Sequence, residues 1–334
     1  MPMHVLRDNE ALPQALNGAC LALGNFDGVH RGHQAVLAEA KARAASAGRP
    51  CGVMVFEPHP REFFRPHVPV FRLTSLEVKL ELFHACGLDF TVVMNFDGEL
   101  AGMEPDAFIE EVLRERLAIS QAIAGFDFHF GKRRKGTPEF LARYGQAHGL
   151  QVTIVEPVSG GEGVFSSSAI RRHLEAGEVD AAASLLGYRW FVRGKVVGGD
   201  KRGRDLGFPT ANIEMPASCR LGFGIYAVRV RRGAGASASV HDAVASYGIR
   251  PTFGGGNPVL EVFIFDFAGD LYGEILEVEF VAWLRPELKF DGIEALIARI
   301  AEDCDDARAA LAGAGGTDSD LDRALGFTPG GAGA

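Results

Sequence analysis

Short apolar runs alternate with stretches of helical periodicity through the first half of the chain. The apolar runs predict strands at residues 20–24, 51–56, 90–94, 121–125 and 151–155. The stretches between them predict helices near residues 31–47, 75–86, 105–117 and 137–148. This alternation predicts an α/β domain with a parallel, dinucleotide-type sheet and helices on both faces. Ligands of such sheets bind beyond the carboxyl ends of the strands.

The pattern changes after Gly187. From Trp190 to Leu284 the chain has the short runs and turns of antiparallel β structure, and apolar residues alternate with glutamates over 275–281. One helical stretch follows, for which Asp291 is the predicted N-cap. We therefore predict a small antiparallel β-barrel domain with a C-terminal helix.

These patterns divide the chain into two domains and a tail. The predicted limits are 1–187 and 188–312, and the Gly- and Ala-rich residues 313–334 are predicted to be disordered. A chain of 334 residues suits two domains, and its 47% apolar content is enough for two packed cores.

Charge and composition narrow the class of function. The net charge of -9 argues against nucleic acid as the main partner. No apolar run is long enough to suggest a membrane span, and the N-terminus lacks the pattern of a secretory signal. The five cysteines are scattered without a Cys-x-x-Cys pair, which is typical of reduced thiols. We expect a cytoplasmic protein and leave a homo-oligomer open.

The most specific string of the first domain joins a strand to a helix. It runs Gly24, Asn25, Phe26, Asp27, Gly28, Val29, His30, Arg31, Gly32, His33. The two histidines are three residues apart, so they share one face of the predicted helix. The glycines permit a tight turn with close approach of a ligand, and the first amides of a helix bind anions. We interpret the string as a phosphate site, although a histidine pair alone is more often a surface or core feature.

Three further segments of the first domain are candidate contacts. His59 lies between two prolines at the end of a predicted strand. Asp127 and Phe128 lie in a loop of alternating aromatic residues that could stack on a planar ring. The hydroxyls of Ser167 and Ser168, with Arg171, open a predicted helix, where they either cap it or bind phosphates.

In the second domain a glycine-rich, basic segment precedes two oxygen donors. Gly198, Gly203 and Arg204 belong to a loop that could hold phosphate or be a solvated hairpin. Thr210 and Asn212 are two residues apart, so in an extended segment their oxygens share one face and suit Mg²⁺.

Glu261 is the candidate base of the second domain. It begins a row of side chains, continued by Phe263 and Phe265, that share one face of a predicted strand. A carboxylate in that setting suits a general base, and an edge glutamate in contact with solvent is an equal alternative from the pattern alone.

The first string resembles the signature of the adenylyl- and cytidylyltransferase superfamily, and within it the bacterial bifunctional riboflavin kinase/FAD synthetases. This resemblance covers about residues 15–187 and implies a nucleotidyltransferase-like fold. It implies that His30 and His33 neutralise ATP phosphates, as imidazolium groups. It further implies that Ser167, Ser168 and Arg171 hold the leaving pyrophosphate. Asn25, His59 and Asp127 would position the nucleotide or FMN. The family often has Thr where Ser168 stands and Asn where Asp127 stands.

The second domain is similar to the riboflavin kinases over about residues 188–310. The similar segments are Gly203–Asn212, Gly248–Phe253, Asp266–Gly273 and Leu284–Pro286. The resemblance implies that Thr210 and Asn212 hold Mg²⁺, that Gly203 and its neighbours hold phosphate, and that Glu261 accepts a proton. With it we place Arg285 among the flavin-binding residues.

Together the resemblances imply an enzyme of flavin cofactor synthesis. The second domain would phosphorylate riboflavin to FMN, and the first would adenylylate FMN to FAD with release of pyrophosphate. Its partners would be riboflavin, FMN and ATP, with Mg²⁺ as cofactor. An enzyme with one active module, and a flavin carrier without turnover, are the alternatives.

Overall fold

The computed structural model describes residues 3–7, 10–160, 163–198, 207–233, 238–249, 258–315 and 319–327. By packing, the chain forms two compact units. The first comprises Met1–Val70 and Thr74–Ser167, and the second comprises Phe71–Leu73 and Ser168–Ala334. The units therefore divide near Ser167, whereas the sequence predicts a domain boundary at residue 187. Within the described residues, no helix has both the length and the apolar character that a membrane span requires.

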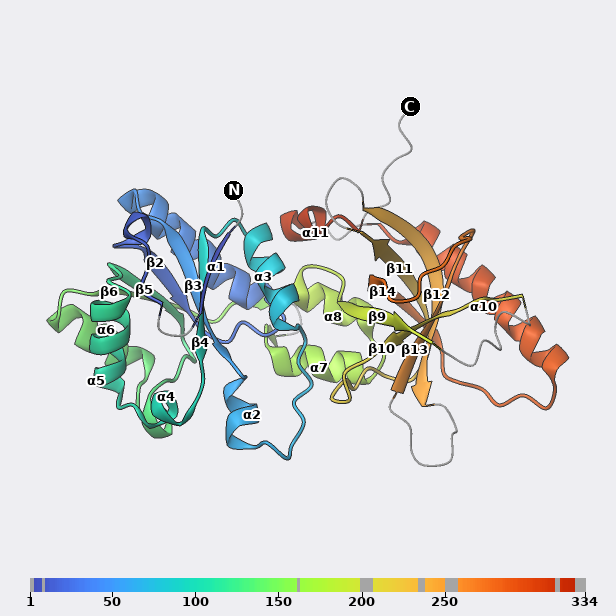
Figure 1. Cartoon of the computed structure of the whole chain (residues 1–334), viewed down its shortest axis with the longest axis horizontal. Coiled ribbons are helices and arrows are strands. Elements are labelled where there is room, and N and C mark those ends of the chain that lie inside the picture. The colour runs from blue at the N-terminus through green and yellow to red at the C-terminus, as the bar shows by residue number, and fades with distance from the viewer. Residues whose placement is uncertain are drawn as a thin grey trace. The chain divides into compact units, whose positions relative to one another are not determined.

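The first unit is built on a six-stranded sheet in the order β1-β4-β3-β2-β5-β6, and Figure 1 labels β2 to β6. All neighbouring strands run parallel. The strands are β1 His4–Arg7, β2 Cys20–Leu23, β3 Cys51–Glu57, β4 Phe90–Asn95, β5 Gln121–Gly125 and β6 Gln151–Val155. Five of them were predicted from apolar runs. Strand β1 was not predicted, because only Leu6 of this edge strand is buried and its apolar pattern is weak.

Helices connect these strands, as expected for parallel pairs. They are η1 Gln14–Leu16, α1 Arg31–Ala47, α2 Pro60–Phe64, α3 Leu76–Ala85, α4 Gly98–Gly102, α5 Pro105–Ala107, a π-helix Phe108–Arg116, η3 Lys132–Arg134 and α6 Pro138–Ala147. Helix α1 packs on β2, β3 and β5 through its buried residues Val36, Leu37, Ala40 and Ala44. A core cluster that includes Leu21, Phe56 and Leu113 joins the sheet to the π-helix. A short hairpin, β7 Ser159–Gly160 and β8 Gly163–Val164, follows β6.

The second unit is a closed six-stranded barrel in the order β10-β13-β12-β11-β14-β9. Its strands pair antiparallel. They are β9 Phe191–Val197, β10 Ala211–Glu214, β11 Gly224–Arg232, β12 Ser239–Ile249, β13 Pro258–Ile264 and β14 Ile275–Arg285. Helices α7 Ser167–Glu175 and α8 Val179–Leu186 precede the barrel. The predicted combination of a parallel α/β sheet with an antiparallel barrel is confirmed.

A long helix, α10 Ile293–Gly313, covers one side of the barrel (Figure 1). It packs on β11, β12 and β14 through Cys304, Ala307 and Leu311. The prediction that Asp291 caps this helix is wrong, since the N-cap is Gly292 and no side chain bonds to the first amides. Glycine can adopt the backbone conformation of an N-cap, but it has no side chain to accept a hydrogen bond from the first amides of the helix.

Part of the predicted disordered tail is ordered. Residues 319–327 contain helix α11 Asp320–Leu325, and Leu325 and Phe327 are buried. Arg231 of the barrel unit holds this segment, since it donates to the carbonyl of Leu325 and lies over the Phe327 ring. Earlier in the tail, Arg189 donates to the carbonyl of Gly315 at 2.8 Å. The composition of the tail did not show these contacts, because they depend on cations far away in the sequence. Residues 328–334 lie outside the described part.

Candidate functional sites

Three predicted segments of the first unit meet at one edge of its sheet. The turns that carry His30, His59 and Phe128 follow β2, β3 and β5, and these strands are adjacent and parallel. Their carboxyl ends therefore lie at the same edge. The chain runs from β2 through β3 to β4 on one side, then returns to β5 on the other side of β2. That reversal is the switch point at which open α/β sheets bind ligands.

The turn after β2 places both histidines at the start of α1. His30 is the N-cap of α1, and its Nδ1 accepts a hydrogen bond from the backbone N–H of His33 at 3.3 Å. The two rings stack with centroids 3.6 Å apart. Gly32 leaves room for this packing, since a Cβ there would come within 3.2 Å of the His30 ring. The two rings thus lie together, although His30 caps the helix and does not share a helical face with His33.

The two imidazoles lie in different electrostatic surroundings. Because His30 Nδ1 is an acceptor, a neutral His30 ring keeps its proton on Nε2. The pKa of His33 is lowered well below 6.5, first by burial and then by the nearby charges of His30 and Lys79. His33 is therefore neutral at physiological pH in the free protein. The imidazolium role beside bound ATP phosphates concerns the liganded protein and stays a prediction.

Two buried polar atoms in this turn have no hydrogen-bond partner within the described residues. They are Oδ1 of Asn25 and Nδ1 of His33. A buried polar atom without a partner is costly and rare, so each such atom needs an explanation. Both belong to the string predicted to bind a nucleotide, which makes them candidate ligand contacts.

Other side chains of the same string support the turn. Phe26 is buried and packs edge-on against His33 and Phe83. The carboxylate of Asp27 accepts hydrogen bonds from the backbone N–H and the hydroxyl of Thr74. The side chains of Phe26 and Asp27 are thus engaged within the protein. Nucleotide contacts of Gly24, Phe26, Asp27 and Gly28 stay a prediction, and they would be made by backbone atoms.

The flavin candidates of the first unit are separate side chains on neighbouring turns. His59 is buried as the N-cap of α2, where its Nδ1 accepts from the N–H of Arg61 at 3.1 Å. Phe128 stacks on Phe130 with centroids 5.5 Å apart, and Asp127 is exposed. Asp127 and Phe128 are thus available at the switch-point edge, while the His59 ring already has a structural bond.

The serine and arginine candidates span the division between the units. The hydroxyl of Ser167, the last residue of the first unit, donates to the backbone carbonyl of Asp27 at 3.0 Å. Ser168 and Arg171 belong to the second unit, where Arg171 Nε donates to the carbonyl of Phe71 at 2.6 Å. Their role with pyrophosphate stays a prediction.

In the second unit, two predicted residues meet across neighbouring strands. Asn212 on β10 lies directly opposite Glu261 on β13, and Ser246 on β12 lies opposite Glu261 on its other side. Residues opposite each other in an antiparallel pair have Cβ atoms about 5 Å apart on one face. Asn212 is buried and Glu261 is half-buried. Thr210 precedes β10 by one residue and is half-buried as well.

The oxygen donors beside Glu261 fit a magnesium ion. Thr210 and Asn212 supply a hydroxyl and an amide oxygen, the hard donors that Mg²⁺ prefers beside nucleotide phosphates. Of the predicted phosphate loop, Gly198 is exposed with open space around it. Gly203 and Arg204 lie outside the described residues.

A second carboxylate near Glu261 was not predicted. Glu287 follows β14, and a Cβ on Gly248 would meet its carboxylate. Gly248 belongs to β12 two residues after Ser246, so Glu287 lies beside the Asn212–Glu261 pair. Burial raises the pKa of Glu287, Arg285 lowers it, and the negative charge of Glu261 raises it. No spacing in the sequence signalled this neighbour, because it arises from strand pairing.

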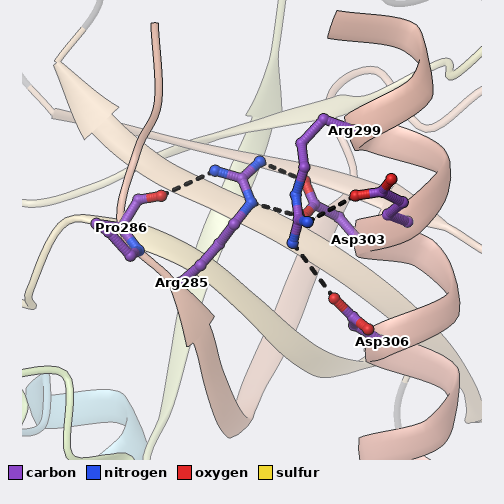
Figure 2. A network of polar contacts seen from close by, with 6 residues as sticks. Arg285, Pro286, Arg299, Asp303 and Asp306 are labelled. Carbon is purple, nitrogen blue, oxygen red and sulfur yellow. Dashed lines mark hydrogen bonds and ion pairs between the residues drawn. The ribbon is translucent and has the colours of Figure 1, made fainter. Parts of the chain in front are cut away.

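Arg285 is held by α10. Its guanidinium donates to the buried carboxylate of Asp303 and to the carbonyl of Pro286, as Figure 2 shows. Arg299 also donates to Asp303, at 3.0 Å. Breaking a buried ion pair is costly, so this network fixes the end of β14 to the helix. The flavin contact predicted for Arg285 stays a prediction.

Two family models match the chain in succession. The FAD synthetase model matches residues 12–169, and the riboflavin kinase model matches residues 186–311. The chain is 39% identical over 295 residues to a bifunctional riboflavin kinase/FMN adenylyltransferase from Listeria monocytogenes, covering 87% of this chain and 92% of that protein. It is 36% identical over 307 residues to one from Haemophilus influenzae, covering 92% and 99%.

The chain belongs to the bifunctional riboflavin kinase/FMN adenylyltransferase family. Another relative, from Escherichia coli K12, is 36% identical over 302 residues, covering 90% of this chain and 96% of that protein. A solved structure described as a macrolide-efflux protein from Streptococcus pneumoniae has a TM-score of 0.82 at 29% identity, covering 92% and 99%. The likeness to that structure is a likeness of fold. The two family models that match the chain both describe flavin enzymes. The family resemblance predicted from the sequence is thus confirmed.

Proposed function

We propose that the barrel unit phosphorylates riboflavin to FMN and that the sheet unit adenylylates FMN to FAD. Each unit has its own candidate residues for binding phosphate or metal. The FAD synthetase model matches the first part of the chain and the riboflavin kinase model matches the second. The observation that carries the first assignment is the Asn212–Glu261 pairing on the barrel. The second assignment is supported by the partnerless Asn25 and His33 atoms at the switch point of the sheet. We also propose that the two catalytic domains have the predicted limits of 1–187 and 188–312. We further propose that the protein works in the cytoplasm.

In the kinase step, the 5′-hydroxyl oxygen of riboflavin attacks the γ-phosphorus of ATP. The bond from that phosphorus to the β,γ-bridging oxygen breaks, and ADP leaves. Glu261 takes the hydroxyl proton, the role of a general base. Thr210 and Asn212 would hold Mg²⁺, which supplies positive charge beside the phosphates when bound. Glu261 lies opposite Asn212, so the base and a ligand of the ion share one face of the barrel.

In the adenylyl transfer, a phosphate oxygen of FMN attacks the α-phosphorus of ATP and pyrophosphate leaves. This nucleophile is already an anion, so alignment and charge control the barrier. The N-terminus of α1 and His30 suit the phosphates of ATP. His33, neutral in the free protein, contributes a hydrogen-bonding nitrogen there. Asn25, Asp127 and Phe128 would position the nucleotide or the flavin.

One assay tests the proposal and its alternatives. Purified protein is incubated with riboflavin, ATP and Mg²⁺, and the flavins are separated by chromatography. We expect FMN first and FAD afterwards. FMN alone would indicate an enzyme with one active module, and neither product would indicate a flavin carrier. A parallel reaction started from FMN and ATP shows the second step by itself.

A further inference from the structure

A buried lysine lies under the histidine turn. Lys79, on α3, is only 4% exposed, and its ammonium donates to the backbone carbonyl of Asn25 at 3.0 Å. A lysine is almost never this buried unless its charge has a specific use, because desolvating an ammonium is expensive. Asn25 is the residue whose side-chain oxygen is buried without a partner within the described residues. Lys79 thus holds the backbone of a residue that carries a candidate ligand contact.

The turn that Lys79 holds is strained. Phe26 and Val29 have φ values of 50° and 38°, a left-handed conformation that costs on the order of 1–3 kcal/mol for each such residue. Such a backbone persists when its surroundings fix it. Thr74 supplies part of that support, since its hydroxyl accepts from the N–H of Gly28 at 3.1 Å. Lys79 supports the same turn from the next helix.

The charge of Lys79 also acts on the neighbouring imidazole. His30 and Lys79 are the charged groups that lower the pKa of His33, in addition to burial. Asp27, the acidic residue of this turn, directs its carboxylate to Thr74. Since His33 is neutral, the histidine pair does not supply a second permanent cation. The Lys79 side chain is a cationic group held beside the site by its hydrogen bond to the Asn25 carbonyl.

We propose that Lys79 is a positioning residue of the adenylyl transfer: its ammonium fixes the Asn25 backbone and adds a preorganised positive charge beneath the nucleotide phosphates. A fixed charge aimed at a site of developing negative charge acts without reorganisation during the reaction. This role rests on the proposed FMN adenylyltransferase function of the sheet unit. It assigns no contact between Lys79 and substrate.

Three substitutions separate this role from a purely structural one. Lys79→Met removes the charge and the donor at similar length, Lys79→Gln keeps a donor without charge, and Lys79→Arg keeps both. Lys41→Met is the matched control, because Lys41 also donates to a backbone carbonyl, that of Cys86, at 2.6 Å, on the exposed side of α1. Each variant is assayed for FAD formation from FMN and ATP and for riboflavin phosphorylation.

We expect Lys79→Met to lower kcat/KM for FAD formation by about 10²-fold, with a higher KM for ATP and unchanged phosphorylation. Lys79→Arg should recover part of the activity, and Lys41→Met should match the wild type. Without the lysine charge the pKa of His33 rises, so the acidic limb of the pH–rate profile should move to higher pH in Lys79→Met. Loosened packing would also raise the pKa of His33, by admitting solvent, so the shift supports the charge only where Lys79→Arg, which keeps the charge, leaves the limb in place.

The outcomes are distinguishable. Full FAD synthesis by Lys79→Met, or a lowered rate with an unmoved acidic limb, would overturn the inference while leaving the proposed function intact. A wild-type protein that makes no FAD from FMN would overturn the proposed function itself. If Lys79→Met does not fold, as judged by circular dichroism, Lys79→Gln decides: the same loss and the same shift support the charge, and wild-type kinetics refute it.

Discussion

Asn212 and Glu261 lie directly opposite each other on β10 and β13, with their side chains on the same face of the barrel. One residue is an oxygen donor and the other is a carboxylate, and they come from segments 49 positions apart (261 minus 212). Strand pairing therefore places the proposed metal ligand beside the proposed proton acceptor. Rotation or slippage of one strand by a single residue would direct the two side chains to opposite faces. The register of this strand pair is thus as important to the kinase step as the residues themselves.

The first prediction concerns the base. Glu261→Gln keeps the shape of the side chain but removes its ability to take a proton. We expect riboflavin phosphorylation to fall by about 10²-fold or more, with ATP binding retained. FAD formation from supplied FMN should be unchanged, because that reaction belongs to the other unit. Glu214→Gln, at an exposed residue of β10, is the control. Full kinase activity in Glu261→Gln would refute the role.

The second prediction concerns the ion. Thr210→Val removes the hydroxyl at nearly constant volume, whereas Thr210→Ser keeps it. We expect the Mg²⁺ concentration for half-maximal phosphorylation to rise about tenfold or more in Thr210→Val, and to stay near the wild-type value in Thr210→Ser. Titration of the kinase reaction with Mg²⁺ measures this shift. Equal Mg²⁺ dependence in the two variants would argue against Thr210 as a ligand.

The sequence predicted the elements better than the contacts between them. Five strands of the sheet were predicted because each is a mostly apolar run, largely buried in β2 to β5 and partly buried in β6. The histidine turn was predicted because its residues are contiguous. Lys79 could not be recognised, since a lysine in a helical stretch normally faces solvent. Its burial depends on a contact with Asn25, 54 residues earlier. Glu287 was missed for the same reason, because its neighbours come from other strands.

The third prediction tests the histidine turn. His30→Asn keeps a side chain that can cap α1 but removes the imidazole. We expect FAD formation from FMN and ATP to fall by about 10²-fold or more, while riboflavin phosphorylation continues at the wild-type rate. The exposed His84 on α3 provides the control variant His84→Asn. Chromatography of flavins reports both reactions in one sample. Normal FAD synthesis by His30→Asn would remove this residue from the site.

The fourth prediction follows from the lowered pKa of His33. Below its ordinary value of 6.5 the unfolded chain binds a proton that the folded chain does not, so acid favours unfolding. The stability linked to His33 is present above pH 6.5 and is lost as the pH falls towards the folded pKa, by up to about 1.4 kcal/mol for each pH unit. His33→Asn should lose less stability than the wild type between neutral and mildly acidic pH. Hydrogen exchange of the β2 and β3 amides measures this for the sheet unit, and equal losses would contradict it.

The last prediction has the opposite sign and concerns the barrel. Burial and the charge of Asp322 raise the pKa of Glu279 from 4.5 to about 8, although Arg229 and two further arginines oppose this shift. Between these values the unfolded chain releases a proton that the folded chain keeps. The stability linked to Glu279 is therefore complete below pH 4.5 and is lost as the pH rises through about 8.

Glu279→Gln removes this titration while keeping the shape of the side chain. Urea unfolding, followed by the fluorescence of Trp190 and Trp283, reports on this unit, since both tryptophans belong to it. The stability of the wild type relative to Glu279→Gln should decrease between mildly acidic and mildly alkaline pH, by up to about 1.4 kcal/mol for each pH unit. Comparison across pH cancels the constant effect of the lost contacts with Arg229. Glu302→Gln, at an exposed residue of α10, should show no such trend. A difference between wild type and Glu279→Gln that stays constant across this pH range would show that the carboxyl is ionised throughout, held by the arginines around it.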